Sequence, residues 1–540
     1  MVDSVQMTAS TLAPCNSFMV MYSSLGRRRT RLALCAFVAS CTGSPIEVPS
    51  PPNAPTAESW PRANPYNIQI PVLYSFNYPL GPSQYAICLS GGGYRAALFH
   101  LGVLWRLNEA GLLYKAARIA GVSGGAITAA VAGANWGKLD FVGGIATNFP
   151  QAIVAPVFDL TSHTIDVESV LFGVLTTVSP SHALVHAYNG FLFSHRTLQS
   201  LPTEGKGPQV VLLASDMRSG TSWFMSRHAM GSPGISYYAY PDMELAVAVA
   251  ASSAYPPVLA PLTIDTSGLK LVLFPWTPTE LSIADREKVD LWLHGEDTPE
   301  KVALASELKQ TLPLGFQAAI REWSDKAVKA QNERIGLDDA AKKTIYLEDG
   351  GVLSNTGYEM CTTSPRFIVS SAALDSENLT PPPKSWISTL STTIDLIYTR
   401  AEQSAIHSIK LGRGNNKCRD FSPRHNCGAL VELSNRRGAE STDYDYEDGL
   451  RAASIPTRLE KLSEKGKKQL INWGYLAAKS ALIVDFAIEG KESLPYPEVD
   501  YRTHTGKCVE KSFPWHAGEV VSDSLAFTEC HRTSEPSKDK

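Results

Sequence analysis

The stretch AARIAGVSGGAITAAVAGA, residues 116–134, decides the fold of this chain. Residues 116–122 form a mostly apolar run that predicts a strand, and the small residues 126–134 predict a helix. Between them, GVSGG at 121–125 fits the pattern G-x-S-x-G, in which a sharp turn projects a serine hydroxyl from the edge of a sheet. The strand and the helix crowd each other two positions before and after the serine, where only glycine fits. The stretch therefore predicts an α/β fold with Ser123 as a nucleophile.

Further apolar runs and one helical pattern extend this unit in both directions. Strands are predicted from the apolar runs 85–90, 210–214, 344–348 and 367–371. After the first run, apolar residues repeat at three- and four-residue spacing and predict a helix through Ala97, Leu98, Leu101, Leu104 and Leu107. The alternation of strands and helices predicts a largely parallel central sheet flanked by helices.

A run of three glycines lies between the first predicted strand and its helix. Attack of a serine on an ester creates an oxyanion that needs N–H donors. Successive unhindered amides for this purpose are present at Gly91, Gly92 and Gly93, and Arg95 could add positive charge. The same glycines could instead begin a dinucleotide-binding loop, but that site needs G-x-G-x-x-G, and Ala96 stands in the place of the last glycine.

Asp349 follows the predicted strand 344–348, precedes two glycines, and supplies a carboxylate. An Asp-Gly pair alone is most often a turn. Beside Ser123, however, the carboxylate would be the base that a serine hydroxyl needs. A free aspartate has a pKa of about 3.9 and is a weak base at neutral pH. We therefore predict that partial burial raises the pKa of Asp349, or that a very short hydrogen bond joins it to Ser123.

Taken in their order along the chain, these elements resemble the patatin-like phospholipase family. The resemblance lies in the glycine run 91–95, the serine motif 121–125 and the DGG motif 349–351. It is supported by SDMRSG at 215–220 and AASSAYPP at 250–257. It covers roughly residues 84–370, and residues 456–482 are similar to the later part of bacterial members. The resemblance implies the family's three-layer α/β fold.

The resemblance also implies a Ser–Asp dyad that needs neither a metal nor a cofactor. The implied residues are Ser123 as the acyl-accepting nucleophile, Asp349 as its base, the amides of Gly91, Gly92 and Gly93 as the oxyanion hole, and Arg95 beside them. The implied activity is hydrolysis of lipid acyl esters, phospholipids included, through an acyl-enzyme that water resolves. The chain departs from the family at Gly357, near the place where members often have a proline, although Asn355 is present.

Other interpretations stay open. A conventional triad would need a histidine after the aspartate in chain order, and the candidates are His407, His425, His504, His516 and His531. The protein could instead be an esterase on soluble acyl esters or thioesters, or a binding protein that keeps the fold without turnover. An apolar surface around Ser123 would favour a lipid substrate. Asp216, a second carboxylate at a strand end, is interpreted as a structural residue.

Composition limits the class of protein and its partners. The 540 residues are 44% hydrophobic and 19% charged, which excludes wholesale disorder. The net charge is −4, so nucleic acid is not an expected partner, because affinity for it comes mostly from basic residues. No run of 18 apolar residues predicts a spanning helix. We expect a catalytic domain at 67–485, with a helical insertion at 264–342, and a C-terminal extension at 486–540.

Residues 1–40 are typical of an export signal, because four arginines precede a short, mostly apolar segment. The segment ends in VASC, which resembles the lipobox of bacterial lipoprotein signals and makes Cys41 the lipidated residue. A plain cleaved signal is the alternative. The proline-rich residues 41–66 are predicted to form an extended tether. The protein is therefore expected to be exported and attached to a membrane of the cell envelope, with a lipid or membrane-surface substrate.

The chain has nine cysteines. Cys88 lies in an apolar run and is predicted to be a buried thiol. Two local pairs, Cys418 with Cys427 and Cys508 with Cys530, lack the spacing of a metal site. In an exported protein these pairs favour disulfides.

Overall fold

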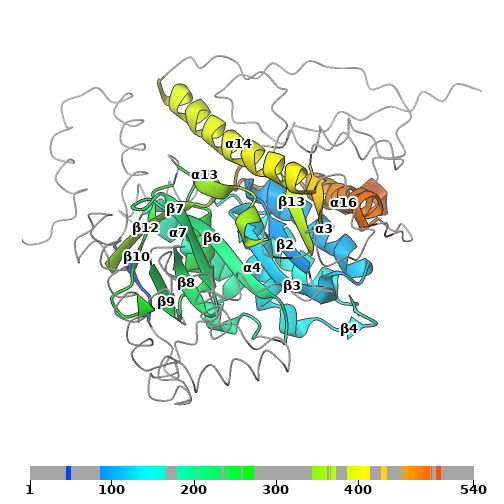
Figure 1. The fold of residues 1–540 in the computed structure, drawn as a ribbon, viewed down its shortest axis with the longest axis horizontal. Helices are drawn as coiled ribbons and strands as arrows, with labels where there is room; N and C mark the ends of the chain where they lie inside the picture. The colour runs from blue at the N-terminus through cyan, green and yellow to red at the C-terminus, as the bar shows by residue number, and fades with distance from the viewer. Residues whose placement is uncertain are drawn as a thin grey trace, which may run out of the picture.

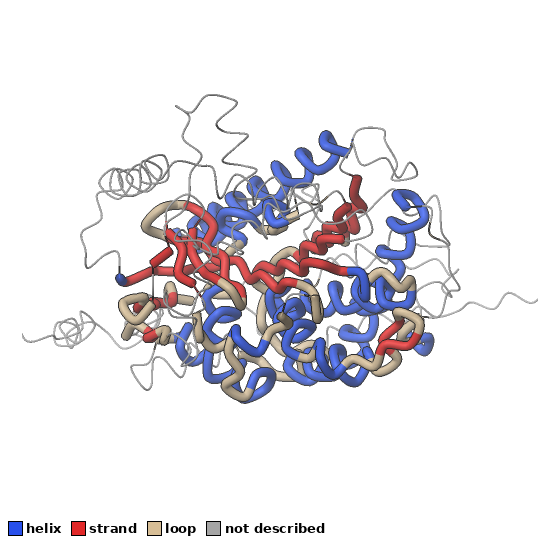
Figure 2. Tube along the Cα trace, turned by 60° about the horizontal axis from the view of Figure 1, so that its bottom comes forward, coloured by secondary structure: helices blue, strands red, loops and turns tan. Residues whose placement is uncertain are grey.

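The computed structural model places a mixed sheet at the centre of the molecule, with helices on both of its faces (Figure 1). Figure 2 shows the strands as a layer between helices, so the predicted α/β class is confirmed. The described residues are 44–49, 85–165, 179–272, 343–372, 386–413, 427–433, 452, 455, 457–486, 488 and 494–499, apart from 204, 233–235, 240, 257–258, 270, 362–363 and 365.

The centre of the sheet is parallel, as predicted. Its strands, in spatial order, are β14 (Cys427–Glu432), β13 (Arg366–Ser371), β2 (Tyr85–Leu89), β3 (Ala116–Val122) and β6 (Gln209–Asp216). Helix α3 (Gly93–Glu109) connects β2 to β3, and α4 (Gly124–Ala134) follows β3. The bounds of β2, β3, β6 and β13 lie within two residues of the predicted runs, whereas β14 was not predicted.

Burial on both faces explains why these strands read as continuous apolar runs. Along β2, Ile87 and Leu89 belong to the core on the side of α3, α4 and α16 (Glu464–Ala481). Their neighbours Ala86 and Cys88 belong to a second core that contains Ile409 of α14 (Trp386–Arg413). The carboxyl ends of the parallel strands share one edge, where ligands of open α/β sheets bind.

An antiparallel part, which the sequence analysis did not predict, extends the sheet beyond β6. It contains β7 (Thr221–Ser226), β8 (Ala229–Ser232), β9 (Ser236–Ala239) and β11 (Leu271–Val272). On the other edge of β6, β12 (Thr344–Asp349) pairs antiparallel, followed by β10 (Leu262–Asp265) and β1 (Ile46–Glu47). Among the described residues, the remaining helices and strands are α5 (Ala155–Leu160), α7 (Pro180–Tyr188), α8 (Leu245–Ser252), α13 (Gly351–Ser354), β4 (Phe141–Val142) and β5 (Ile145–Ala146), with short 3₁₀ and π turns between them.

Two predicted boundaries and one predicted thiol are corrected. Part of the expected tether belongs to the sheet, because β1 pairs with β10 and Val48 is buried. Residues at the start of the expected helical insertion belong to β10 and β11 instead, and residues 273–342 lie outside the described residues. Cys88 is not a thiol but forms a disulfide with Cys361. It was misread because its partner is 273 residues away and in no local motif.

Several predictions fall outside the described residues: the signal segment with Cys41, most of the tether, most of the C-terminal extension, and both predicted local disulfides. Within the described part of the chain, no helix has the length and apolar character needed to cross a membrane.

Candidate active site

Ser123 occupies a strained turn between β3 and α4. Its backbone has φ 50° and ψ −117°, a left-handed φ that is uncommon for a residue with a side chain. A Cβ on Gly121 would lie 2.5 Å from the carbonyl oxygen of Gly125, and a Cβ on Gly125 would lie 2.3 Å from that of Leu89. The predicted need for glycine is therefore confirmed at both positions, although Gly125 is crowded by the end of β2 and not by the strand that precedes the serine.

A second serine stabilises this turn. The Ser123 N–H donates to Ser252 Oγ at 2.8 Å, and Ser252 Oγ donates to the carbonyl oxygen of Leu213 at 2.5 Å. Ser252 is the last residue of α8 and is fully buried. Ser252 lies in the stretch AASSAYPP at 250–257, and no role was predicted for it.

Strand pairing brings Asp349 to Ser123. Strand β3 pairs with one edge of β6 and ends at Val122, which lies opposite Leu213. Because β7 occupies the other edge of β6, β12 continues beyond β3 and pairs Asp349 with Ala214. The carboxyl ends of β3 and β12 therefore meet head-on. There the Ser123 side chain lies close enough to the Asp349 carboxyl group to lower the pKa of that group.

The Asp349 carboxyl group is almost fully buried, with 2% of the residue exposed. Burial raises its pKa from 3.8 to about 7, although hydrogen bonds from Ser123 and from the Gly351 N–H oppose the rise. The Gly351 N–H donates to Asp349 Oδ1 at 2.7 Å. The predicted increase in pKa by burial is confirmed.

The glycine run lies directly against the serine turn, at the start of α3. Gly92 and Gly93 have positive φ values of 135° and 60°. A Cβ on Gly124 would lie 2.1 Å from the carbonyl oxygen of Gly93, so the two backbones touch. The Gly91 N–H already donates to the backbone oxygen of Asn355 at 2.9 Å. Of the three predicted oxyanion donors, Gly92 and Gly93 lie at the helix start, where N–H groups have no intrahelical acceptor.

Arg95 lies in the first turn of α3 and is buried. Its Nη1 donates to the carbonyl oxygen of Ile455 at 2.9 Å, and its Nη2 donates to that of Ala372 at 3.0 Å. Burial lowers the pKa of the guanidinium to about 10, against the effect of the Glu402 carboxylate. The side chain remains charged at neutral pH and stabilises the segments beside the glycine run.

Residues 87–272 match the patatin-like phospholipase family. This part of the chain is therefore a patatin-like domain. No curated protein matches it. Among solved structures, human GIVD cytosolic phospholipase A2 is 13% identical over 69% of this chain and 52% of its own, with a TM-score of 0.31. The same human protein in complex with methyl gamma-linolenyl fluorophosphonate is 16% identical over 33% of this chain and 29% of its own, with a TM-score of 0.23. The chain spans about half or less of the length of these human structures.

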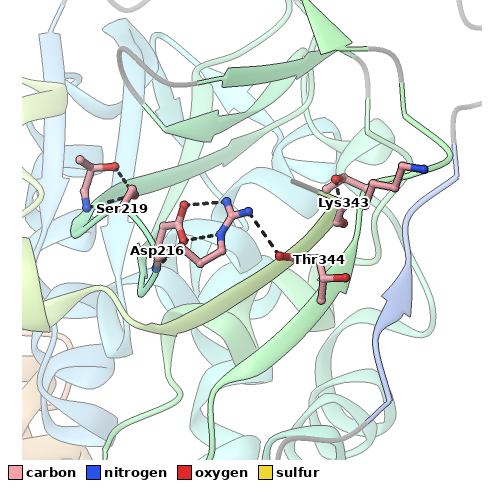
Figure 3. Close-up of polar contacts among 7 residues, drawn as sticks. Asp216, Ser219, Lys343 and Thr344 are labelled. Atoms are coloured by element: carbon pink, nitrogen blue, oxygen red, sulfur yellow. Dashed lines mark hydrogen bonds and ion pairs between the residues drawn. The ribbon is translucent and has the colours of Figure 1, made fainter. Parts of the chain in front are cut away.

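The second carboxylate of the patatin-like domain is bound to an arginine. Asp216 Oδ1 accepts from Arg218 Nε at 3.0 Å, and Oδ2 accepts from Nη2 at 2.9 Å. The same guanidinium donates to the carbonyl oxygen of Thr344 at 3.3 Å, which connects the end of β6 to the start of β12 (Figure 3). Asp216 therefore has the structural role that was predicted for it.

The histidine candidates for a triad find no support in the described part of the domain. His407 is exposed on α14, and the other four lie outside the described residues. The buried His100, which the sequence analysis missed, lies 2.8 Å from both the carbonyl oxygen of Ser90 and Ser370 Oγ. Burial lowers the pKa of His100 to about 4, so the ring is neutral and supports the segment before the glycine run. Within the described residues, no three or more His, Cys, Asp or Glu side chains gather as a metal site would require.

Proposed function

We propose that this protein is a serine acyl hydrolase that cleaves acyl esters of lipids, phospholipids included. The observation that carries the proposal is that β3 and β12 end against each other on β6, which places the Ser123 turn beside the buried carboxyl group of Asp349, whose pKa is raised to about 7. A general base is most effective when its pKa lies near the working pH. Asp349 meets this condition without a histidine.

In the proposed reaction, Ser123 Oγ attacks the acyl carbonyl carbon while its proton passes to Asp349. The amides of Gly92 and Gly93 donate to the oxyanion, together with the Gly124 amide at the start of α4. Asp349 then returns the proton to the leaving alkoxide, and the acyl group stays on Ser123. Water resolves this acyl-enzyme, with Asp349 again accepting the proton.

Two observations favour this function over its alternatives. Large apolar side chains are exposed near the site, on α13 at Leu353 and on α14 at Leu396 and Ile397, and this favours a lipid over a soluble ester. Burial of the Asp349 carboxyl group beside the strained turn at Ser123 lowers the stability of the fold. A protein that only binds a ligand would gain no activity in return. An enzyme is therefore favoured over a binding protein.

The test compares wild-type protein with Ser123→Ala and with Ser404→Ala, an exposed serine on α14 as the matched control. A short p-nitrophenyl acyl ester and phospholipid vesicles are the two substrates. We expect hydrolysis by the wild type and by Ser404→Ala, and a loss of at least 1,000-fold in Ser123→Ala. Hydrolysis that survives in Ser123→Ala would identify another nucleophile, and a folded but inactive wild type would favour the binding protein.

A further inference from the structure

The buried carboxylate of Glu402 lies on α14 and has no part in the steps proposed above. It is 3% exposed. Its Oε2 accepts from Asn355 Nδ2 at 2.5 Å, and its Oε1 accepts from Ser371 Oγ at 2.5 Å. Each oxygen of the carboxyl group thus lies within hydrogen-bond distance of a polar side chain, Asn355 on one side and Ser371 on the other.

The Asn355 side chain lies between the two glycine-containing loops of the site. A Cβ on Gly91 would lie 2.3 Å from Asn355 Oδ1, and a Cβ on Gly351 would lie 2.7 Å from the same atom. The backbone oxygen of Asn355 accepts from the Gly91 N–H at 2.9 Å. Asn355 therefore contacts the start of the glycine run and the residue that donates to Asp349.

Opposing effects act on the Glu402 carboxyl group, and its pKa is raised overall. Burial raises the pKa of Glu402, and Glu432 raises it further. Its hydrogen bonds from Ser371 and Asn355 and the Arg95 guanidinium lower the pKa. Arg95 also donates to Ala372, directly after Ser371, so the cation and the carboxylate are bound to the same end of β13.

We propose that Glu402 is a positioning residue for the oxyanion hole. By orienting the Asn355 amide, it sets the distance between the glycine run and the Ser123–Asp349 pair. Such an effect acts on the transition state rather than on substrate binding, because the oxyanion forms only as the ester is attacked. The inference rests on the proposed function.

The first test is Glu402→Gln. The glutamine keeps the shape of the side chain, but its amide NH2 group replaces one of the two oxygens that accept from Asn355 and Ser371. We expect kcat on the p-nitrophenyl ester to fall 10- to 100-fold with KM changed less than twofold. The acid limb of the pH–rate profile should stay near pH 7, because Asp349 is not altered. The matched control is Lys410→Gln, which removes an exposed ion pair between α14 and Glu432 and should leave kcat unchanged.

A reciprocal pair of substitutions separates positioning from general damage. In Glu402→Gln combined with Asn355→Asp, the new amide can donate to the new carboxylate, so kcat should recover at least fivefold over Glu402→Gln alone. Wild-type hydrolysis with an unchanged kcat in Glu402→Gln would overturn this inference alone. A fall in kcat with an equal rise in KM, a shifted acid limb and no recovery in the double variant would also overturn it. A folded wild type that hydrolyses neither ester would overturn the proposed function as well.

Discussion

At Asp349, burial and hydrogen bonding act on one carboxyl group in opposite directions, and burial prevails. Because the pKa is about 7, the basic form is lost as the pH falls below that value. We expect kcat/KM on a soluble ester to fall about tenfold per pH unit below pH 7 and to level off above it. A profile measured from pH 5 to pH 9 checks this. An acid limb near pH 4 would contradict it.

The same pKa predicts a cost in stability. The carboxyl group has a pKa of 3.8 when unfolded and about 7 when folded, so the folded state binds the proton more tightly. Stability from this group is present below pH 3.8 and is lost as the pH rises through 7. Asp349→Asn should therefore be more stable than wild type at pH 8, by at most about 4 kcal/mol, and similar to it at pH 4. Urea unfolding at both pH values measures the difference. An Asp349→Asn variant that is no more stable than wild type at pH 8 would contradict the prediction.

Gly125 allows the serine turn to approach β2. An alanine there would place its Cβ 2.3 Å from the carbonyl oxygen of Leu89 and 2.6 Å from that of Ser90, both in the backbone. We expect Gly125→Ala to lower the free energy of unfolding by about 3 kcal/mol or more and to abolish hydrolysis. Gly137→Ala is the matched control, because no atom lies within 4 Å of its added Cβ. Thermal unfolding of both variants tests the difference, and equal stability would refute the argument.

At the scale of elements, α14 differs between its two halves. The C-terminal half packs on the sheet through Ile409 and Glu402, whereas residues 386–399 contain one charged residue, Asp395. In that half, Leu396 is 62% exposed and Ile397 is 49% exposed. Figure 1 shows α14 crossing the molecule next to α13, which follows Asp349 directly. Leu396 and Ile397 thus form an exposed apolar surface near α13, which would suit the lipid substrate proposed above.

This surface gives a prediction that separates lipid from soluble esters. Leu396→Ser with Ile397→Ser should lower the rate on phospholipid vesicles at least fivefold and leave the rate on a monomeric p-nitrophenyl ester unchanged. The matched control is Val142→Ser on β4, an exposed apolar residue on a strand that lies apart from α14, at the lower right of Figure 1. Equal losses on both substrates, or equal effects of the control, would count against the lipid surface.

The sequence predicted those elements whose burial leaves a local pattern. The parallel strands are covered on both faces, so β2, β3 and β6 appear as apolar runs. The antiparallel β7, β8 and β9 were missed because serine, threonine and glycine interrupt them. The 28-residue α14 was missed because serine and threonine fill its first half and blur the helical period.

The candidate site divides in the same way. Ser123 and Asp349 were predicted because each lies in a short motif whose glycines the backbone requires. Glu402 and Ser252 were not predicted, because each acts through a contact with a residue far away in the sequence. Glu402 is 47 residues from Asn355, and Ser252 is 129 residues from Ser123. No local spacing marks such a contact. Residues that orient a site are therefore harder to find in one sequence than residues that react.

At the scale of the whole molecule, residues 44–49 attach the N-terminal segment to the folded body. His182 Nε2 lies 2.9 Å from the Ser44 carbonyl oxygen, Val48 N–H donates to Asp265 at 3.2 Å, and Asp242 N–H donates to Pro49 at 3.0 Å. Ser44 is three residues after Cys41, and three residues span at most about 10 Å. A lipid on Cys41 would therefore hold the β1 side of the sheet close to the membrane, rather than at the end of a long tether.

This attachment predicts the behaviour of a protein expressed with its own signal. We expect wild type in the membrane fraction after a high-salt wash, because two acyl chains suffice for stable attachment. Cys41→Ser should be released to the soluble fraction and keep its rate on the p-nitrophenyl ester, since residues 44–49 still pair with β10. The matched control is Cys35→Ser, inside the predicted signal segment, which should stay in the membrane fraction. A soluble wild type would mean a plain cleaved signal, and a membrane-bound Cys41→Ser would mean that something other than a lipid on Cys41 holds the protein at the membrane.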